Sequence, residues 1–275
     1  METSTLVDDG KMAYIELNDL RKEYVERRTK KRSRSDHEVK GDKLVVLDGI
    51  DLEFKEGELV CILGPSGCGK STMLRIIAGF DTATSGKVLI HGSEVRKPCP
   101  ESVFVFQQDG LLPWMTVREN MELGLTHVDN EEEKNERVKE YIELVELTGF
   151  ENNYPYQLSG GMKRRAELAR ALVVNPEMLM MDEPFTGLDF LTHMKMREEV
   201  VNMHEFIGKT MIMITHFIDD ALTMADRVVV LSERPTTVKM VRELNVQRPR
   251  NIEKDPLLRE LRDEIYLMLG VSYVV

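Results

Sequence analysis

Short runs of consecutive apolar residues recur along the chain, each followed by a polar or glycine-rich turn. They lie at residues 59–63, 103–106, 178–181, 211–214 and 228–231. Strands buried on both faces read as continuous apolar runs, whereas half-exposed strands alternate. A helix is expected directly after the first run, from residue 71 to 78. The pattern therefore predicts the α/β class, with a sheet covered on both faces.

The middle of the chain, from residue 116 to about 171, carries no strong strand signal. Its charged stretch at 131–147 repeats an apolar position at helical spacing, at Val138, Ile142 and Val145. An apolar stripe with this period is typical of an amphipathic helix. We therefore expect a helical insertion between strands of the sheet.

Two further segments stand out. Residues 27–34 hold six Lys or Arg and no apolar residue, so we expect an exposed loop at 25–43. Such a loop is either simply solvated or contacts anionic lipid headgroups. One more helix is expected at 255–269, with an apolar stripe formed by Leu258, Leu261, Ile265 and Met268.

Composition narrows the class of protein. The 275 residues carry a formal net charge of -11, which argues against nucleic acid as a partner because nucleic-acid binders neutralise phosphates. The three cysteines (Cys61, Cys68 and Cys99) lack metal-ligand spacing, which indicates a reducing compartment. The acidic start lacks the apolar core of a signal peptide, and no run approaches about 18 apolar residues. We expect a cytoplasmic location.

One glycine-rich motif is typical of phosphate binding. It reads Gly64-Pro65-Ser66-Gly67-Cys68-Gly69-Lys70-Ser71. Glycines let main-chain amides wrap around phosphate oxygens, and the following helix start favours the same negative charge. Lys70 is expected to reach the β- and γ-phosphates of ATP, Ser71 to ligate Mg²⁺, and Thr72 to continue the motif. The flanking strand and helix favour this interpretation over an ordinary glycine-rich turn.

Two adjacent carboxylates, Asp182 and Glu183, follow the apolar run at 178–181. Ligands of open α/β sheets bind at the carboxyl ends of the strands. We expect Asp182 to hold Mg²⁺ and Glu183 to act as the general base on the attacking water. An acidic turn at a strand end would show the same pair of carboxylates. The assignment of these roles therefore depends on the presence of the phosphate loop in the same chain.

A second candidate anion site begins the helix after residue 158. Ser159 suits an N-cap, and Gly160 and Gly161 leave the first helix amides accessible. A plain capped helix start explains the same residues equally well.

Taken in order, these motifs resemble the ATP-binding-cassette (ABC) ATPases over nearly the whole chain. The resemblance is carried by the phosphate loop, Gln107, Ser159-Gly160-Gly161, Asp182-Glu183, Asp189 and His216. It implies a P-loop NTPase fold with an antiparallel β subdomain and a helical subdomain. It also implies a division into a nucleotide-binding core at 12–107 and 172–275, a helical subdomain at 108–171 and a basic insertion at 25–43.

The resemblance also implies roles. Gln107 matches the residue that senses Mg²⁺ and the attacking water, and His216 matches the contact to the γ-phosphate. Asp189 matches the loop that couples two sites across a homodimer, in which Ser159 and its glycines complete the partner's ATP site. Tyr24 matches the aromatic that stacks on adenine, with a core or surface tyrosine as the alternative.

Three stretches resemble the importer branch that serves nitrate, sulfonate, taurine and bicarbonate. They are Leu111-Leu112-Pro113-Trp114-Met115-Thr116-Val117, Met162, and Leu231-Ser232-Glu233-Arg234-Pro235. The implied partners are two integral-membrane permease subunits and an extracytoplasmic solute-binding protein, with this chain peripheral at the cytoplasmic face of the inner membrane. Trp114 and Leu111 are candidates for the groove that receives the membrane subunits, or core residues of the helical insertion.

Rival functions are an ABC ATPase acting away from membranes, an exporter subunit, or an ATP sensor without turnover. Members that act in DNA repair carry long coiled-coil insertions and ribosomal members carry two cassettes, and neither fits this chain. An exporter subunit is separable only by its partner. The intact Glu183 and His216 argue against a sensor.

Overall fold

The computed structural model describes residues 13–25, 43–99, 101–107, 110–126 and 128–270. Most of the basic stretch expected to form a loop at 25–43 lies outside these residues. Within them, no helix is both long and apolar enough to span a membrane.

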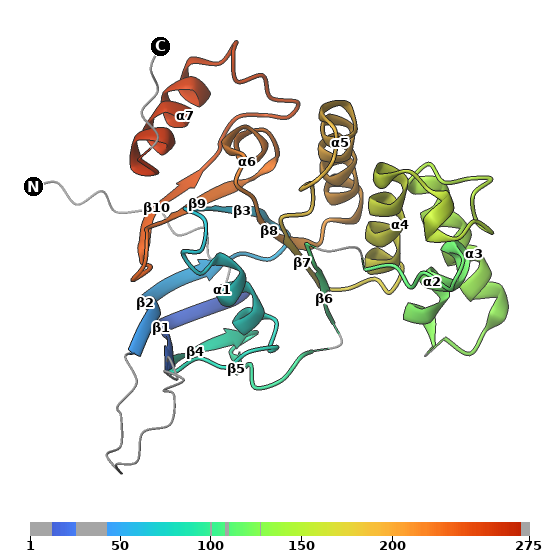
Figure 1. The fold of residues 1–275 in the computed structure, drawn as a ribbon, viewed down its shortest axis with the longest axis horizontal. Coiled ribbons are helices and arrows are strands. Elements are labelled where there is room, and N and C mark those ends of the chain that lie inside the picture. The colour runs from blue at the N-terminus through green and yellow to red at the C-terminus, as the bar shows by residue number, and fades with distance from the viewer. Residues whose placement is uncertain (1–12, 26–42, 100, 108–109, 127, 271–275) are drawn as a thin grey trace, which may run out of the picture.

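A six-stranded sheet forms the centre of the molecule, with the order β10-β9-β3-β8-β7-β6 (Figure 1). Strands β9, β3, β8, β7 and β6 run parallel, and β10 is antiparallel to β9. All five strands predicted from apolar runs are confirmed. The strands are β3 (Leu59–Leu63), β6 (Ser102–Val105), β7 (Met178–Asp182), β8 (Thr210–Ile214), β9 (Arg227–Leu231) and β10 (Val238–Glu243).

A second sheet is antiparallel throughout, with the order β2-β1-β4-β5. Its strands are β1 (Ile15–Val25), β2 (Lys43–Phe54), β4 (Ser85–Ile90) and β5 (Ser93–Glu94). Buried Ile15 and Leu17 alternate with partly exposed residues, so one face of β1 packs on the core. The antiparallel β subdomain is thereby confirmed.

Strand β3 shows why both faces of the central sheet are apolar. Leu59, Cys61 and Leu63 belong to one hydrophobic core, whereas Val60 and Ile62 belong to another. The second core also contains the buried side of α1 (Lys70–Ile77) and the inner face of the antiparallel sheet. Helix α1 therefore lies between the two sheets, and its N-terminus is fixed from both sides.

Helices cover the opposite face of the central sheet and extend beyond its β6 edge (Figure 1). The expected helices are confirmed: Val138 and Ile142 of α3 are buried, as are Leu258, Leu261 and Ile265 of α7. The helices are α2 (Val117–Glu122), α3 (Glu131–Leu144), α4 (Gly160–Leu172), α5 (Phe190–Ile207), α6 (Ile218–Met224) and α7 (Pro256–Met268).

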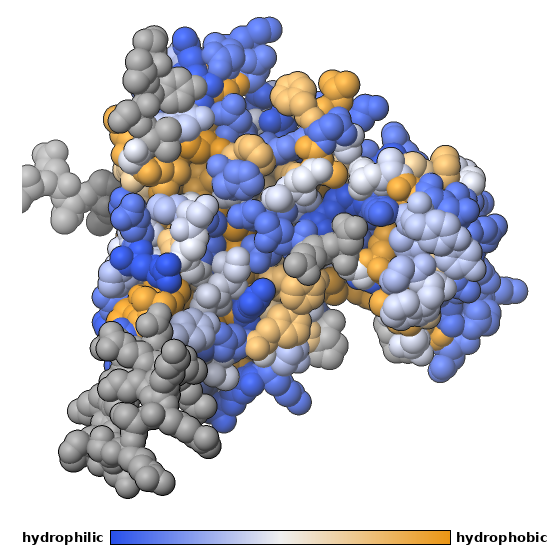
Figure 2. Space-filling model, viewed as in Figure 1, coloured by the Kyte–Doolittle hydropathy of each residue, from blue (hydrophilic) through white to orange (hydrophobic). Residues whose placement is uncertain are grey.

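The helical part formed by α2, α3 and α4 follows β6 and precedes β7 (Figure 1). Two short 3₁₀ helices, Leu123–Leu125 and Pro155–Gln157, connect its helices. Figure 2 shows a largely hydrophilic surface here, with apolar surface gathered beside it over β6. The domain boundaries assigned at 107/108 and 171/172 stay a prediction.

Candidate nucleotide-binding site

The glycine-rich loop joins the end of β3 to the start of α1. Gly69 has a φ of 124°, and a Cβ on it would lie 2.7 Å from Cγ1 of Val46. Any other residue at this position would be strained and would collide with β2. Glycine therefore lets the loop close tightly against β2, and the amides of such a loop are suited to surround a phosphate.

Lys70 is almost fully buried at the base of this loop. Its ammonium donates to the carbonyl oxygens of Gly64, at 2.8 Å, and Pro65, at 3.0 Å. A lysine has three N–H donors, so one remains for a phosphate oxygen. The two loop carbonyls thus hold the positively charged Lys70 ammonium in place.

Ser71 and Asp182 come from α1 and β7 and meet across the site. The Ser71 hydroxyl donates to Oδ1 of Asp182 at 3.0 Å. Burial raises the pKa of Asp182 and the charge of Glu183 raises it further, while the hydrogen bond from Ser71 opposes both. One carboxylate and one hydroxyl beside a triphosphate are a donor set that suits Mg²⁺, which keeps waters and uses few protein ligands.

Glu183 lies at the carboxyl end of β7, and three side chains converge on its Oε2. Gln107 Nε2 donates at 3.2 Å, Thr186 Oγ1 donates at 3.2 Å, and His216 Nδ1 lies 3.5 Å away. The backbone of Glu183 is left-handed, with a φ of 49°, which is uncommon for a non-glycine residue. The structure thus brings together Gln107, Glu183 and His216, as expected, and adds Thr186, which the sequence did not single out.

Tyr24 lines the same cleft of about 470 Å³ as Lys70, Gln107 and Glu183. Its side chain is half exposed, and its hydroxyl donates to Asp81 at 3.1 Å. The Lys22 ammonium lies over the ring, 5.0 Å from its centroid. Its role in adenine stacking stays a prediction.

The second candidate anion site forms a regular capped helix start. Ser159 accepts a hydrogen bond from the amide of Met162 at 3.3 Å, and a Cβ on Gly161 would lie 2.4 Å from Cγ2 of Thr192. Asp189 caps α5 and accepts from Thr192. Among the described residues that line the phosphate-loop cleft, none comes from residues 159–161 or is Asp189. One chain does not bring these groups to the Glu183 side of the site.

A buried ion pair on α4, absent from the expectations, connects the helical part to the sheet. Arg164 and Glu167 bind each other, and both are less than a tenth exposed. Arg164 also donates to the carbonyls of Phe106 and Pro184, and Glu167 accepts from the amide of Gly110. The segments on either side of Gln107 and just after Glu183 therefore share one anchor. In the sequence, this pair reads as part of a charged helix surface.

A second pair, of a buried carboxylate and a partly buried histidine, lies behind His216. His193 Nε2 is 2.7 Å from Oδ2 of Asp220, whose pKa is raised by burial and lowered in turn by His193. The His193 ring lies between those of Phe185 and Phe217, with centroids 5.2 and 4.9 Å away. These contacts join α5, α6 and the segments that carry Glu183 and His216. In the sequence, His193 is an isolated histidine inside a helix, and nothing there predicted this arrangement.

The two groove candidates differ in exposure. Leu111 is buried in the core, whereas Trp114 is 68% exposed. Leu111 is thus a core residue, and only Trp114 presents a large apolar surface.

The fold and the site define a P-loop ATPase. The ABC transporter family profile matches residues 47–186. The chain is 42% identical over 206 residues to the aliphatic sulfonates import ATP-binding protein SsuB of Bacillus thuringiensis, covering 75% of this chain and 81% of that protein. It is 42% identical over 228 residues to the nitrate import ATP-binding protein NrtD of Synechococcus elongatus, covering 80% and 83%.

Among solved structures, the ATP-binding cassette MJ0796, in a dimeric post-hydrolysis state bound to ADP and Pi, matches with a TM-score of 0.69 and 33% identity. The match covers 85% of this chain and 100% of that one. The chain therefore belongs to the ATP-binding proteins of the ABC transporter family, and it is an ATPase of that family.

Proposed function

We propose that this chain is the ATP-hydrolysing subunit of an importer and works as a homodimer with membrane subunits. The observation that carries the proposal is the convergence of Gln107, Thr186 and His216 on one oxygen of Glu183, at the mouth of the phosphate loop. A carboxylate so placed is suited to take a proton from an attacking water.

In this mechanism the loop amides and Lys70 hold the phosphates. Ser71 and Asp182 would hold Mg²⁺, which would supply positive charge to the phosphate oxygens. Glu183 orients and deprotonates the water. Gln107 contributes a donor beside that water, and His216 is positioned to contact the γ-phosphate. All of these groups lie at the carboxyl ends of parallel strands, where the sheet holds them rigidly.

The dimer supplies what the single chain lacks. Ser159 and its glycines start a helix whose exposed amides suit an anion, yet they line no part of the cleft beside Lys70. We propose that they close over the ATP of a second copy, with Asp189 next to the partner's site. The dimeric form of MJ0796 supports this arrangement.

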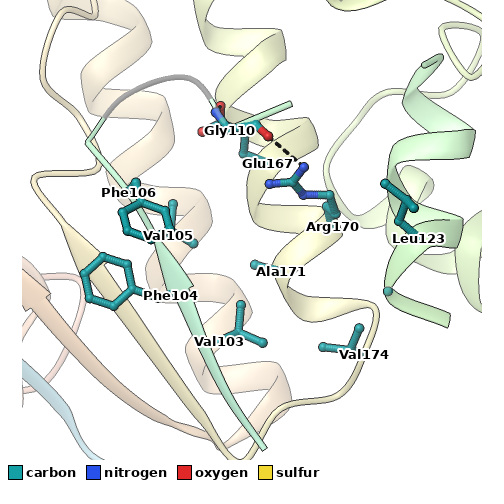
Figure 3. Close-up of a pocket in the computed structure, with 11 residues that line it drawn as sticks. Val103, Phe104, Val105, Phe106, Gly110, Leu123, Glu167, Arg170, Ala171 and Val174 are labelled. Atoms are coloured by element: carbon teal, nitrogen blue, oxygen red, sulfur yellow. Dashed lines mark hydrogen bonds between the residues drawn. The ribbon is translucent and has the colours of Figure 1, made fainter. Parts of the chain in front are cut away.

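A pocket of about 290 Å³ between β6 and the helical part supports a membrane partner (Figure 3). Its floor is apolar, with Val103, Ala171 and Val174, and the Arg170 guanidinium donates to the Gly110 carbonyl at one end. We propose that it receives a short segment of each membrane subunit. Two permease subunits and an extracytoplasmic solute-binding protein complete the importer, and this chain lies peripherally at the cytoplasmic face of the inner membrane.

The names of the relatives point to small anions as cargo. SsuB is named for aliphatic sulfonates and NrtD for nitrate. We propose a solute of this class, such as nitrate, a sulfonate or taurine.

The test combines partner and transport. The tagged chain, purified from membranes in mild detergent, should carry integral-membrane subunits with it, and vesicles containing the complex should take up labelled nitrate or taurine only with internal ATP. A matched complex with Glu183→Gln should bind ATP but take up nothing. Uptake that proceeds unchanged in this variant would overturn the proposal, and ATP-driven export of the solute would identify the exporter alternative.

A further inference from the structure

The loop that follows β9 folds back over the phosphate loop. The Thr236 hydroxyl donates to the carbonyl of Cys68, which is inside the glycine-rich motif. The backbone of Thr236 also pairs with β2: its amide donates to Val46 at 3.0 Å, and its carbonyl accepts from the amide of Asp48 at 2.9 Å. These bonds fix residues 232–237 against the same two segments that form the cleft.

Ser232 closes this loop internally. Its hydroxyl donates its one proton to the carbonyl of Glu233 at 2.7 Å, with the carbonyl of Pro235 as a second, longer acceptor at 3.3 Å, and it accepts from the amide of Thr237 at 2.9 Å. The tip of the loop is therefore held in one shape. Arg234 is the residue at that tip.

The Arg234 side chain is exposed and lines the cleft that also contains Lys70 and Ser71. Its Nη2 lies 3.6 Å from the position that a Cβ on Gly67 would occupy, so the guanidinium is next to the middle of the phosphate loop. Within the part of the chain that the structure describes, nothing accepts a hydrogen bond from it or pairs with it.

This unpaired state contrasts with other arginines that connect segments of the fold. The guanidinium groups of Arg164 and Arg250 donate hydrogen bonds to main-chain carbonyls. A guanidinium presents five donors in a planar fork that matches a phosphate group. A guanidinium that stands beside a phosphate loop, on a backbone held by hydrogen bonds and without a protein acceptor, is suited to bind an anion in that loop.

We propose that Arg234 is a further binding residue of this site, which contacts the phosphate chain of the nucleotide from outside the glycine-rich loop. The inference rests on the proposed function, because it requires ATP in this cleft. Arg234 makes none of the contacts to Glu183, so we expect it to hold the phosphates equally before and during the reaction. Such uniform binding changes KM and leaves kcat unaltered.

The test compares Arg234→Ala, Arg234→Lys and Arg242→Ala. Arg242 is an exposed arginine of β10, where it faces Glu264 at 3.6 Å, and its removal changes the net charge equally. Arg234→Ala should raise the Kd for ATP and for ADP about tenfold and raise KM similarly at unchanged kcat. Arg234→Lys should recover part of the loss because it keeps the charge without the fork, and Arg242→Ala should match the wild type.

Three results would overturn the role of Arg234. The first is an unchanged Kd in Arg234→Ala, and the second is an equal weakening in Arg242→Ala, which would reveal a general charge effect. The third is a fall in kcat and melting temperature with no recovery in Arg234→Lys, which would indicate loss of loop structure alone. If Arg234→Ala binds ATP normally but fails to dimerise, the guanidinium contacts the partner copy instead. Only a wild type that binds no ATP would remove the proposed function as well.

Discussion

The phosphate-loop edge of the central sheet and the Ser159 end of α4 both present backbone amides suited to an anion, yet they differ in what surrounds them. At the sheet edge, Lys70, Asp182 and Glu183 meet in one cleft. At the start of α4, Ser159 accepts from the amide of Met162 and Gly161 packs on Thr192 of α5, and no charged group of the described cleft lies among these contacts. This difference fits the proposal that one chain holds most of a site and that the start of α4 closes the site of a second copy.

The two regions also differ in how they are anchored. The sheet edge is built on parallel strands buried on both faces, so its geometry follows from packing. The helical part shares the apolar core of one face of that sheet, and buried polar contacts such as those of Arg164 and Glu167 add to it. These polar contacts join α4 to the segments next to Gln107 and Glu183.

The largest effect is expected from breaking the contact between Arg164 and Glu167. Glu167→Ala leaves the buried Arg164 charge without its partner, so it should lower the free energy of unfolding by about 3–5 kcal/mol. Urea unfolding measures this change. The matched control is Glu146→Ala, which removes an exposed partner of Arg165 and should cost at most about 0.5 kcal/mol. Equal losses of unfolding free energy in both variants would show that the Arg164–Glu167 pair stabilises the fold no more than an exposed ion pair does.

The next-largest effect concerns ATP hydrolysis at the phosphate-loop edge of the central sheet. Glu183→Gln should lower the ATPase rate at least about 100-fold, because the amide cannot accept the proton of the attacking water. ATP binding should persist, since Lys70 and the loop are untouched. A steady-state phosphate-release assay measures the rate. Normal turnover in this variant would assign the base to another group.

A mixing experiment tests whether the two regions act on different chains. Lys70→Ala removes the phosphate contact, and Ser159→Arg blocks the closing piece, so each variant alone should be nearly inactive. Mixed in equal amounts, half of the random dimers contain one intact pair of regions, and activity should return to roughly a quarter of the wild type. Failure to recover any activity, with mixed dimers demonstrated by dual tags, would contradict sharing between chains.

The smallest effect concerns a surface pair outside both regions. Lys55 donates to Glu243 at 2.8 Å, and this hydrogen bond lowers the pKa of Glu243 below its usual 4.5. Both side chains are about half exposed, so Lys55→Ala should cost only about 0.3 kcal/mol at neutral pH. Because the folded-state pKa is the lower one, this stability is present above pH 4.5 and is lost as the pH falls through the folded value. Thermal melts from pH 7 to pH 3 measure it, and a constant difference would exclude the pair as its source.

The strands and helices predicted correctly from the sequence are those in which the burial of apolar side chains is the dominant interaction. The strands at β3 and β7 are continuous apolar runs, and α3 repeats its apolar positions at helical spacing, so burial alone accounts for them. The antiparallel sheet was expected only from the family resemblance, because β1 is irregular, with a shifted register and a φ of 46° at Asp19.

Within the site, the motif residues were expected because their chemistry is local in sequence. Several contacts between distant segments were not. The bonds from the Arg164–Glu167 pair to Phe106, Gly110 and Pro184, and the approach of Arg234 to Gly67, depend on how segments far apart along the chain pack. Thr186 lies only three residues from Glu183, yet an ordinary threonine in a turn gives no signal of that contact. Charged side chains of that kind look like ordinary surface residues until the fold places them.

The most direct measurement is the mass of the Glu183→Gln protein in sedimentation equilibrium, with and without ATP and Mg²⁺. We expect a monomer without nucleotide and a dimer with two trapped ATP molecules when ATP and Mg²⁺ are both present. A protein that stays monomeric with ATP bound, under conditions where the wild type hydrolyses it, would contradict a site shared by two chains.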